Sequence, residues 1–132
     1  MKNVKPYKEL ISMTEIRLPH DHGQKIEALC GHVPPAADFL TVSDLFKQFS
    51  DASRLRIFWL LCHGEECVSN ISALVEMSSP AVSHHLRQLK SAGLIESRRD
   101  GKEVFYRAAV TETARLLHRV IEQTMSIVCP LE

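Results

Sequence analysis

Side chains that bind metal ions are concentrated near the start of the chain, where prolines and glycines interrupt any long helix. The stretch "HDHG" offers His20 and His22, and "CGH" offers Cys30 and His32. Nitrogen and thiolate donors of these types suit tetrahedral zinc or cadmium. Three histidines and a cysteine within thirteen residues are hard to attribute to core packing, so this segment predicts a metal site. The alternative is a solvated polar arm with a half-buried Cys30.

The remaining cysteines differ in their surroundings. Cys62 ends the strongly apolar stretch "RIFWLLC" and is expected in the core. Cys129, before Pro130, either joins the arm site, pairs oxidatively with Cys30 or stays a partly exposed thiol. The sequence has no apolar run of transmembrane length and no signal-peptide pattern, which predicts a cytoplasmic protein with no membrane partner. Its four cysteines are then thiols or metal ligands rather than a disulfide framework.

Positive charge is concentrated in one segment although the whole chain is neutral. Sixteen basic and sixteen acidic residues cancel. From Ser79 to Arg107, however, six basic residues stand against three acidic ones, and the rest of the chain carries ten basic and thirteen acidic residues. Such a local excess indicates a nucleic-acid partner. The six basic residues are Arg87, Lys90, Arg98, Arg99, Lys102 and Arg107.

Helical periodicity begins at "TVSDLFKQFSD". It continues through "DASRLRIFWLLCHG", a helix that is apolar on most sides and therefore belongs in the centre of a domain. Asp51 or Ser53 can cap this helix, and Gly64 is placed to end it. "CVSNISALVEM" predicts another short helix. We therefore divide the chain into an N-terminal arm, residues 1–38, and a folded domain, residues 39–132.

The stretch "SSPAVSHHLRQLKSAG" predicts a helix capped by Ser79, with a proline at its first position and a glycine at its end. Val82, Leu86 and Leu89 recur at spacings of four and three, so they face one way. Polar side chains, among them two adjacent histidines, are left toward solvent. A short helix, a tight turn and this polar-faced helix make a helix-turn-helix.

Two short segments, "LIESRR" and "KEVFYR", flank Asp100-Gly101, the dipeptide favoured by two-residue type I′ hairpins. They predict a β-hairpin wing with basic residues near its tip. "TETARLLHRVIEQTMSIV" then predicts a terminal helix whose apolar face includes Leu117 and Ile121. A second copy of the chain is the expected cover for that face. The predicted fold is mainly α with a small β-hairpin wing, a dimeric winged helix-turn-helix.

The order helix, helix, helix-turn-helix, wing, helix resembles the ArsR/SmtB family of metal-sensing bacterial repressors. "DASRLRIFWLL" is similar to the family's "D-x-x-R-L-x-I-L-x-L-L", and "EECVSNIS" to its "E-L-C-V-x-D-L". "SSPAVSHHLRQLKSAGLIESRRDGKEVFYR" is similar to its recognition helix and wing. The resemblance covers about residues 42–123. It implies a homodimer that binds an inverted-repeat operator in double-stranded DNA and lets go when a metal effector binds.

The resemblance also implies which residues contact DNA. The second helix of the helix-turn-helix would read base edges, while the wing arginines neutralise phosphates. The family's "V-S-H-H-L" pattern places His84 and His85 next to DNA, and the alternative is that His85 packs against the wing or the preceding helix. The expected DNA-binding residues are Ser79, Ala81, Ser83, His84, His85, Arg87, Gln88, Arg98, Arg99 and Lys102.

One metal site of the family lies on the terminal helix. Its four ligand positions here carry a valine, Glu112, a glutamine and a serine, so only Glu112 could bind an ion. A displaced site would combine Glu112 with His118 and Glu122, which lie one turn apart. A histidine and a glutamate at that spacing are usually an ordinary polar pair.

The family's other metal site joins the "E-L-C-V-x-D-L" segment to an N-terminal arm, typically of the opposite subunit. Cys67 occupies its first ligand position, whereas Ser69 and Asn70 stand where a second cysteine and an aspartate are common. The arm must therefore supply the other ligands. The expected metal ligands are Cys30, His32, Cys67, His20 and His22, and the expected ion is Zn(II) or Cd(II).

These observations predict a metal-responsive, DNA-binding transcriptional repressor. A thiol-based repressor of the same fold, responsive to oxidants or reactive sulfur, is one alternative. A metal-buffering or structural zinc protein is another, but it leaves the basic helix and wing unexplained. The sequence contains no nucleophile motif, phosphate loop or paired-carboxylate pattern, so we do not expect an enzyme.

Overall fold

The computed structural model describes residues 17–26, 28 and 33–131 of the 132-residue chain. The chain divides into two units, Met1–Asp44 and Leu45–Glu132. In the first unit His20 and His22 lie in irregular chain, and helix α1 (Ala36–Lys47) begins before the unit ends. The predicted end of the arm, at residue 38, falls in the first turn of this helix. The predicted arm ligands Cys30 and His32 lie outside the described residues.

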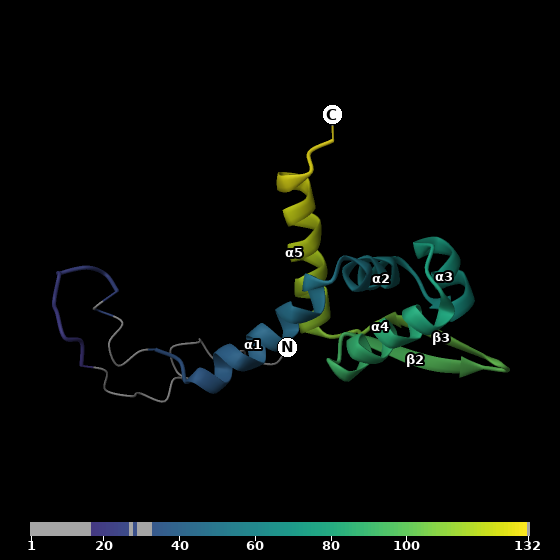
Figure 1. The fold of residues 1–132 in the computed structure, drawn as a ribbon, viewed down its shortest axis with the longest axis horizontal. Coiled ribbons are helices and arrows are strands. Elements are labelled where there is room, and N and C mark those ends of the chain that lie inside the picture. Colours follow the sequence, from purple (N-terminus) through teal and green to yellow (C-terminus); the bar gives the residue numbers. More distant parts are fainter. Residues whose placement is uncertain (1–16, 27, 29–32, 132) are drawn as a thin grey trace. The chain divides into compact units, whose positions relative to one another are not determined.

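The second unit has the predicted winged helix-turn-helix architecture. Figure 1 shows α4 beside the hairpin of β2 and β3. Helices α2 and α3 lie on the opposite side of α4 from the hairpin, and α5 extends away from them. The short helices pack around one apolar core, while the hairpin projects beyond it as the wing. After α1 the elements are η3 (Gln48–Ser50), α2 (Ala52–His63), β1 (Glu66–Cys67), α3 (Val68–Val75), α4 (Ser79–Ser91), β2 (Ile95–Asp100), β3 (Glu103–Ala108) and α5 (Glu112–Val128).

Helix α2 is the centre of this unit because its sequence is apolar on most sides. Ile57 and Phe58 have no exposed surface, and Leu61 is buried with them. The helix ends before Gly64, as predicted. Around it, α3, α4, β2 and α5 each contribute apolar side chains to one continuous core. These are Ile71, Val75, Val82, Leu86, Leu89, Ile95, Ala114, Leu117 and Ile121, together with Leu94 before β2.

Arg54, near the start of α2, carries a charge into this core. It is only 9% exposed. Its Nε donates to the Gln48 carbonyl at 2.6 Å, one terminal nitrogen donates to the Lys47 carbonyl at 3.2 Å, and the other donates to the side-chain oxygen of Gln88 on α4. A buried charge is costly unless its donors are paired. The Asp51 carboxylate caps the same helix start by accepting from the Arg54 backbone N–H at 3.0 Å.

Helix α4 begins one residue earlier than its predicted cap implies. Ser78 is the N-cap, and its hydroxyl accepts from the Ala81 N–H at 3.3 Å. Both serines are good caps by type, but Ser79 already has helical geometry, and its hydroxyl lies 3.2 Å from that of Ser72 on α3. The three apolar residues predicted to face inward are buried. Gly93, with φ of 74°, follows the helix end.

The wing is an antiparallel hairpin whose turn is shifted by one residue from our prediction. Asp100 pairs with Glu103, so the turn consists of Gly101 and Lys102. Gly101 has φ of 63°, whereas Lys102 does not have a positive φ. A glycine at the first central position is the requirement of a type II′ turn, not of the predicted type I′ turn. Strand β1 pairs with the other edge of β3, which gives the strand order β1-β3-β2.

Only the first part of α5 packs against the winged unit. Leu117 and Ile121 are buried in the core of their own subunit, which corrects the expectation that a second copy covers them. Further along, Ile127 and Val128 are 78% and 69% exposed, and Figure 1 shows the helix leaving the rest of the unit in this direction. The described helices include none with both the length and the apolar character needed to cross a membrane.

Replacing Arg54 by alanine should lower the free energy of unfolding by about 2–5 kcal/mol, because each buried acceptor left without a donor costs about 1–3 kcal/mol. Urea unfolding followed by circular dichroism measures this change. Arg56→Ala removes an exposed arginine from the same helix and is the matched control. It should change the unfolding free energy by less than about 1 kcal/mol. Equal losses in the two variants would contradict the structural role of Arg54.

Candidate functional site

The two adjacent histidines of α4 point in different directions. His84 is exposed, and its Nε2 lies 3.1 Å from the side-chain nitrogen of Gln88, one turn later. The Gln88 oxygen accepts from Arg54, so the Gln88 nitrogen faces His84 and must donate to it. His84 Nε2 therefore accepts, and the hydrogen of its neutral ring lies on Nδ1. The buried arginine thus determines which ring atom His84 offers as a donor.

His85 packs inward instead. Its side chain is 12% exposed, and its Nε2 lies 3.9 Å from the carboxylate of Asp51 at the start of α2. The backbone N–H of Arg54, and to a smaller extent the charge of His85, lower the pKa of Asp51. The buried Nδ1 of His85 has no hydrogen-bond partner within the described residues. His85 therefore fits the packing alternative, and its neighbour is the start of α2.

The other polar residues of α4 also divide into exposed side chains and side chains that contact the rest of the unit. Arg87 is exposed and has no acidic partner in the described part of the chain. Lys90 donates to the Ser97 hydroxyl at 2.7 Å, which links α4 to β2. His84 and Arg87 are thus the outward side chains at the centre of the helix. The remaining predicted contacts lie at the exposed helix start or are partly covered: Ser79, Ala81, Ser83 and Gln88.

The two neighbouring arginines of the wing have opposite surroundings. Arg98 donates from Nε to the Glu65 carboxylate at 2.8 Å, makes a second bond to it from a terminal nitrogen, and lies over the Phe105 ring. The hydrogen bonds from Arg98 lower the pKa of Glu65. Side chains alternate along a strand, so Arg99 lies on the other sheet face, where Ser97 contacts α4.

The wing therefore offers Arg99 and Lys102 to a ligand, while Arg98 anchors the hairpin. Arg99 and Lys102 are exposed and have no acidic partner among the residues that the structure describes. All three residues were predicted to contact DNA. Counting charges in the sequence does not distinguish adjacent arginines, whereas strand alternation places their side chains on opposite faces of the sheet.

Two of the five predicted arm-site ligands, Cys30 and His32, lie outside the described residues. Of its histidines, His20 and His22 are exposed, with stacked rings whose centroids are 5.8 Å apart. Cys67 is 8% exposed and precedes the first turn of α3. No group of three metal-binding side chains within the described ranges includes Cys67. The arm site therefore stays a prediction.

Three metal-binding side chains meet where α2 and α5 pack together. His63 is the last residue of α2, and His118 and Glu122 are one turn apart on α5. Glu122 Oε1 lies 3.3 Å from His63 Nε2 and 3.1 Å from His118 Nε2. The candidate ligand atoms of all three residues lie within 4.8 Å of one another. The predicted pair on α5 is thus close enough to interact, but its third member is His63 and not Glu112.

Trp59 orients the carboxylate of this cluster. Its indole N–H donates to Glu122 Oε1 at 2.9 Å, and its ring centroid lies 4.3 Å from that of His63. The hydrogen bond from Trp59, followed by those from His118 and His63, lowers the pKa of Glu122. The carboxylate is therefore held as an anion that faces two imidazole rings.

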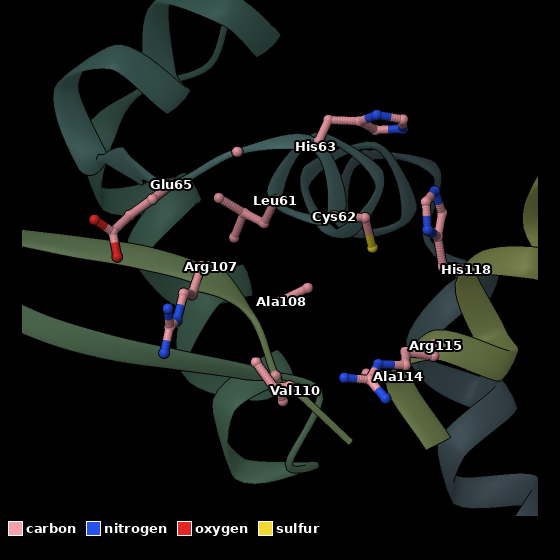
Figure 2. A pocket seen from close by; sticks show the side chains of 12 residues that line it. Leu61, Cys62, His63, Glu65, Arg107, Ala108, Val110, Ala114, Arg115 and His118 are labelled. Carbon is pink, nitrogen blue, oxygen red and sulfur yellow. The ribbon is translucent and has the colours of Figure 1, made fainter. Parts of the chain in front are cut away.

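The cluster borders an open pocket of about 520 Å³ between the end of α2, the end of β3 and the start of α5. Figure 2 shows His63 and His118 together on one side of this pocket, with the Cys62 sulfur directed into it. Glu65 and Arg107 lie on the opposite side (Figure 2). The pocket leaves space for water or a small ligand beside the two histidines.

Cys62 is held as a neutral thiol. It is half-buried against the core, and burial, with the negative charge of Glu122, raises the pKa of its thiol to about 11. Since the thiolate is the reactive form, Cys62 is a weak nucleophile near neutral pH. Cys67 is buried and Cys129 is exposed, and all three of these cysteines are free.

Local sequence spacing does not identify His63 and Trp59 as members of a site. They are separated from Glu122 by 59 and 63 residues, and no helical or strand repeat relates positions so far apart. A weak signal exists in the periodicity of the two helices. Trp59 and His63 are four residues apart on α2, as His118 and Glu122 are on α5, so each pair shares one helix face.

Known proteins similar to this chain are bacterial regulators of transcription. A family described as "Bacterial regulatory protein, arsR family" matches residues 51–97. The cadmium resistance transcriptional regulatory protein CadC of Listeria innocua is 43% identical over 70 residues, 52% of this chain and 59% of that protein. The arsenic resistance transcriptional regulator ArsR2 of Pseudomonas putida is 36% identical over 87 residues, 65% of this chain and 75% of the relative. The chain spans 56–59% of the length of three cadmium regulators that it matches.

A solved structure supports the same comparison. The homodimeric winged helix-turn-helix DNA-binding domain of a possible ArsR-family regulator from Mycobacterium bovis has a TM-score of 0.63 and 33% sequence identity to this chain. The match covers 74% of this chain and 87% of the other. Neither the relatives nor this neighbour are enzymes by description, which agrees with the absence of an enzyme motif in the sequence.

Alkylation with iodoacetamide, resolved by peptide mass spectrometry, should show that Cys62 reacts far more slowly than the exposed Cys129 at pH 8. With a pKa of about 11, about one Cys62 side chain in a thousand is thiolate at that pH. The Cys62 rate should rise about tenfold per pH unit until the pKa is reached. Equal rates for the two cysteines at pH 8 would mean that Cys62 is accessible and ionised.

Proposed function

The chain belongs to the ArsR family of bacterial regulatory proteins, and from this premise we propose that it is a transcriptional repressor that binds operator DNA as a homodimer and releases it when a metal ion binds. The arrangement of α4 and the wing carries the proposal. His84 and Arg87 point outward from α4, and Arg99 lies on the sheet face that packs toward α4. A helix with outward polar groups fits the major groove, and the neighbouring hairpin fits the phosphate backbone.

The two sets of side chains would have different roles on DNA. Arg87 can donate two hydrogen bonds to a guanine, and His84 can donate from Nδ1 to a base acceptor. Arg99 and Lys102 would neutralise phosphates, which contributes affinity without sequence preference. Gln88 acts behind His84 by fixing its ring, and Arg98 acts by holding the wing in place.

The homodimer would form through the part of α5 that its own subunit leaves uncovered. An apolar groove of about 360 Å³ lies along α5 and the end of α1, and Thr124 is its one polar residue besides a cysteine. Along its rim Val120, Met125 and Val128 are 41%, 41% and 69% exposed. Covering these side chains with the same face of a second copy removes apolar surface from water and gives a self-complementary interface. The homodimeric Mycobacterium bovis neighbour supports this assembly.

A metal ion is the proposed effector, and the protein would act in the cytoplasm, where its operator is. The named functions of two relatives, cadmium resistance and arsenic resistance, support a metal or metalloid signal. The predicted ligands of the arm, with Cys67, suit Zn(II) or Cd(II). The raised pKa of Cys62 argues against a thiol sensor at that position. A metal-buffering role would leave the outward residues of α4 and the wing without a purpose.

The neighbouring arginines of the wing provide a matched test of the DNA interface. Operator duplexes are selected from a random pool by the wild-type protein, and affinity is measured by fluorescence anisotropy at several salt concentrations. Arg99→Ala should reduce the slope of log affinity against log salt by about 0.9 for each phosphate that the variant no longer neutralises. Arg98→Ala, one residue away on the other face, should leave that slope unchanged. Equal slopes in both variants would show that strand orientation does not decide which arginine meets DNA.

In the same assay His84→Ala should reduce the preference for the operator over random DNA by about 1–3 kcal/mol and leave the salt slope unchanged. A variant that selects the operator as well as the wild type would remove His84 from the set of base contacts. If the wild-type protein selects no sequence at all, the proposal of a DNA-binding repressor fails.

Charge introduced on the exposed face of α5 should separate the subunits. Val120→Glu combined with Val128→Glu places two carboxylates in an apolar interface, where an unpaired charge is costly, and sedimentation velocity should then show monomers. Both positions are exposed in the isolated subunit, so each variant should fold. Arg119→Glu, on the polar face of the same helix, should remain dimeric. A dimer that survives the double substitution would place the interface elsewhere.

A further inference from the structure

We propose that His63, His118 and Glu122 form a binding site for a borderline divalent cation such as Zn(II), and that the bound ion controls DNA binding by clamping α2 to α5 within one subunit. The geometry of these three side chains supports the binding site by itself. Its regulatory consequence rests on the proposed function, because it requires that the protein bind DNA.

The spacing of the three side chains suits a tetrahedral ion. Two ligands held at about 2.0–2.1 Å from zinc are about 3.3 Å apart at the tetrahedral angle. Glu122 Oε1 already lies 3.3 Å from His63 Nε2 and 3.1 Å from His118 Nε2. Small side-chain rotations would direct all three atoms at one ion. Two imidazoles and a carboxylate occupy three positions and leave the fourth to water from the adjoining pocket.

The hydrogen bonding of Glu122 supports a cation over a purely structural cluster. Three nitrogens, from Trp59, His63 and His118, converge on its Oε1 at 2.9, 3.3 and 3.1 Å. A carboxylate oxygen has about two lone-pair directions, so three converging nitrogens exceed the number that can donate to it with good geometry. A cation at the centre removes this excess, because each imidazole then presents a lone pair to the ion. Trp59 alone would remain a donor and hold the carboxylate in place.

An ordinary polar pair explains only part of the arrangement. His118 and Glu122 are one turn apart on α5 and would meet in any helix of this sequence. His63 comes from a different helix, and its ring meets that of His118 edge to face at 5.0 Å between centroids. The side chains of His63 and His118 are 48% and 28% exposed, so an ion can reach them from solvent.

The donor set predicts which ions bind. It contains nitrogen and oxygen donors, and the group includes no cysteine. Imidazole and carboxylate favour Zn(II), Co(II) and Ni(II), whereas arsenite and cadmium prefer thiolates. Zn(II) suits both this site and the predicted site at Cys67, whereas Ni(II) should favour this site and Cd(II) the other.

The position of the site provides a route to regulation. Helix α2 carries Arg54, which bonds to Gln88 of α4, while its other end carries His63 at the site. An ion that fixes the end of α2 to α5 therefore fixes the angle between the DNA-reading helix and the helix proposed to form the dimer. Half-sites on DNA are about 34–36 Å apart, so a change in that angle alters whether both reading helices dock together. The ion can shift DNA binding only as far as its affinities for the DNA-binding conformation and the released conformation differ.

The single tryptophan of the chain makes binding at this site directly measurable. Trp59 donates to the proposed ligand Glu122, so adding Co(II) to the full-length protein should quench its fluorescence and produce the visible absorption of tetrahedral cobalt. His63→Asn and His118→Asn should each weaken Zn(II) binding, measured by competition against Co(II), by at least about tenfold. Cys67→Ser is the control, and its Trp59 response to Co(II) should match that of the wild type, because Cys67 is not part of this group. His63 is half exposed, so its replacement should not unfold the chain.

Two outcomes would overturn the site. The first is a Zn(II) affinity in both histidine variants equal to that of the wild type. The second is loss of the Trp59 response in Cys67→Ser, which would show that the ion binds at the cysteine site instead. Operator binding measured with and without Zn(II) then tests regulation separately. In Cys67→Ser, which lacks the cysteine of the predicted arm site, Zn(II) should still release the operator, whereas Cys67→Ser combined with His63→Asn should stay bound. If the site binds Zn(II) but the operator is not released, only the regulatory clamp is overturned. If the protein binds no operator, the proposed function is overturned, and the cobalt spectrum still tests whether the metal site exists.

Discussion

Burying the guanidinium group of Arg54 requires three acceptors from two separate parts of the chain at the same time. The Lys47 and Gln48 carbonyls supply two of them and the Gln88 side chain of α4 supplies another. Because a buried charge without partners would cost several kcal/mol, α2 and α4 are held in one relative position. The same bond fixes the Gln88 amide, and through it the ring of His84. One buried residue thus connects the stability of the core to the surface that we propose reads DNA.

Both ends of helix α2 make polar contacts with other helices. Its first turn bonds to α4 through Arg54, and its last turn places Trp59 and His63 against α5. Ile57, Phe58 and Leu61 between them are buried, so a bend within the helix would disturb the close-packed core. A signal at one end can therefore reach the other through a change in helix packing, without a mobile loop. Two donor sets of different softness, nitrogen and oxygen at α5 and thiolate at Cys67, would let such a chain separate borderline ions from thiophilic ones.

The wing shows how a short strand assigns separate roles to adjacent residues of one type. Arg98 and Arg99 have the same charge and reach and both are exposed, but Arg98 is paired with Glu65 and lies over the Phe105 ring, whereas Arg99 has no acidic partner in the described part of the chain. Arg98 would have to break its bonds to Glu65 before it could bind a phosphate, whereas Arg99 would not. The basic character of a segment therefore overstates the number of groups that are free to bind DNA.

Residues close in sequence determined most of the fold. Helical periodicity identified α2 and α4, a glycine turn identified the wing, and the errors were shifts of one residue at Ser79 and at the Asp100-Gly101 turn, where neighbouring residue types were equally suitable. Local spacing also paired His118 with Glu122. Tertiary structure alone decided that His63 and Trp59 join them, that His85 packs inward, and that Leu117 and Ile121 are covered by their own subunit. Each of these outcomes depends on which helix faces meet, and helix packing brings together residues whose separation along the chain has no fixed period.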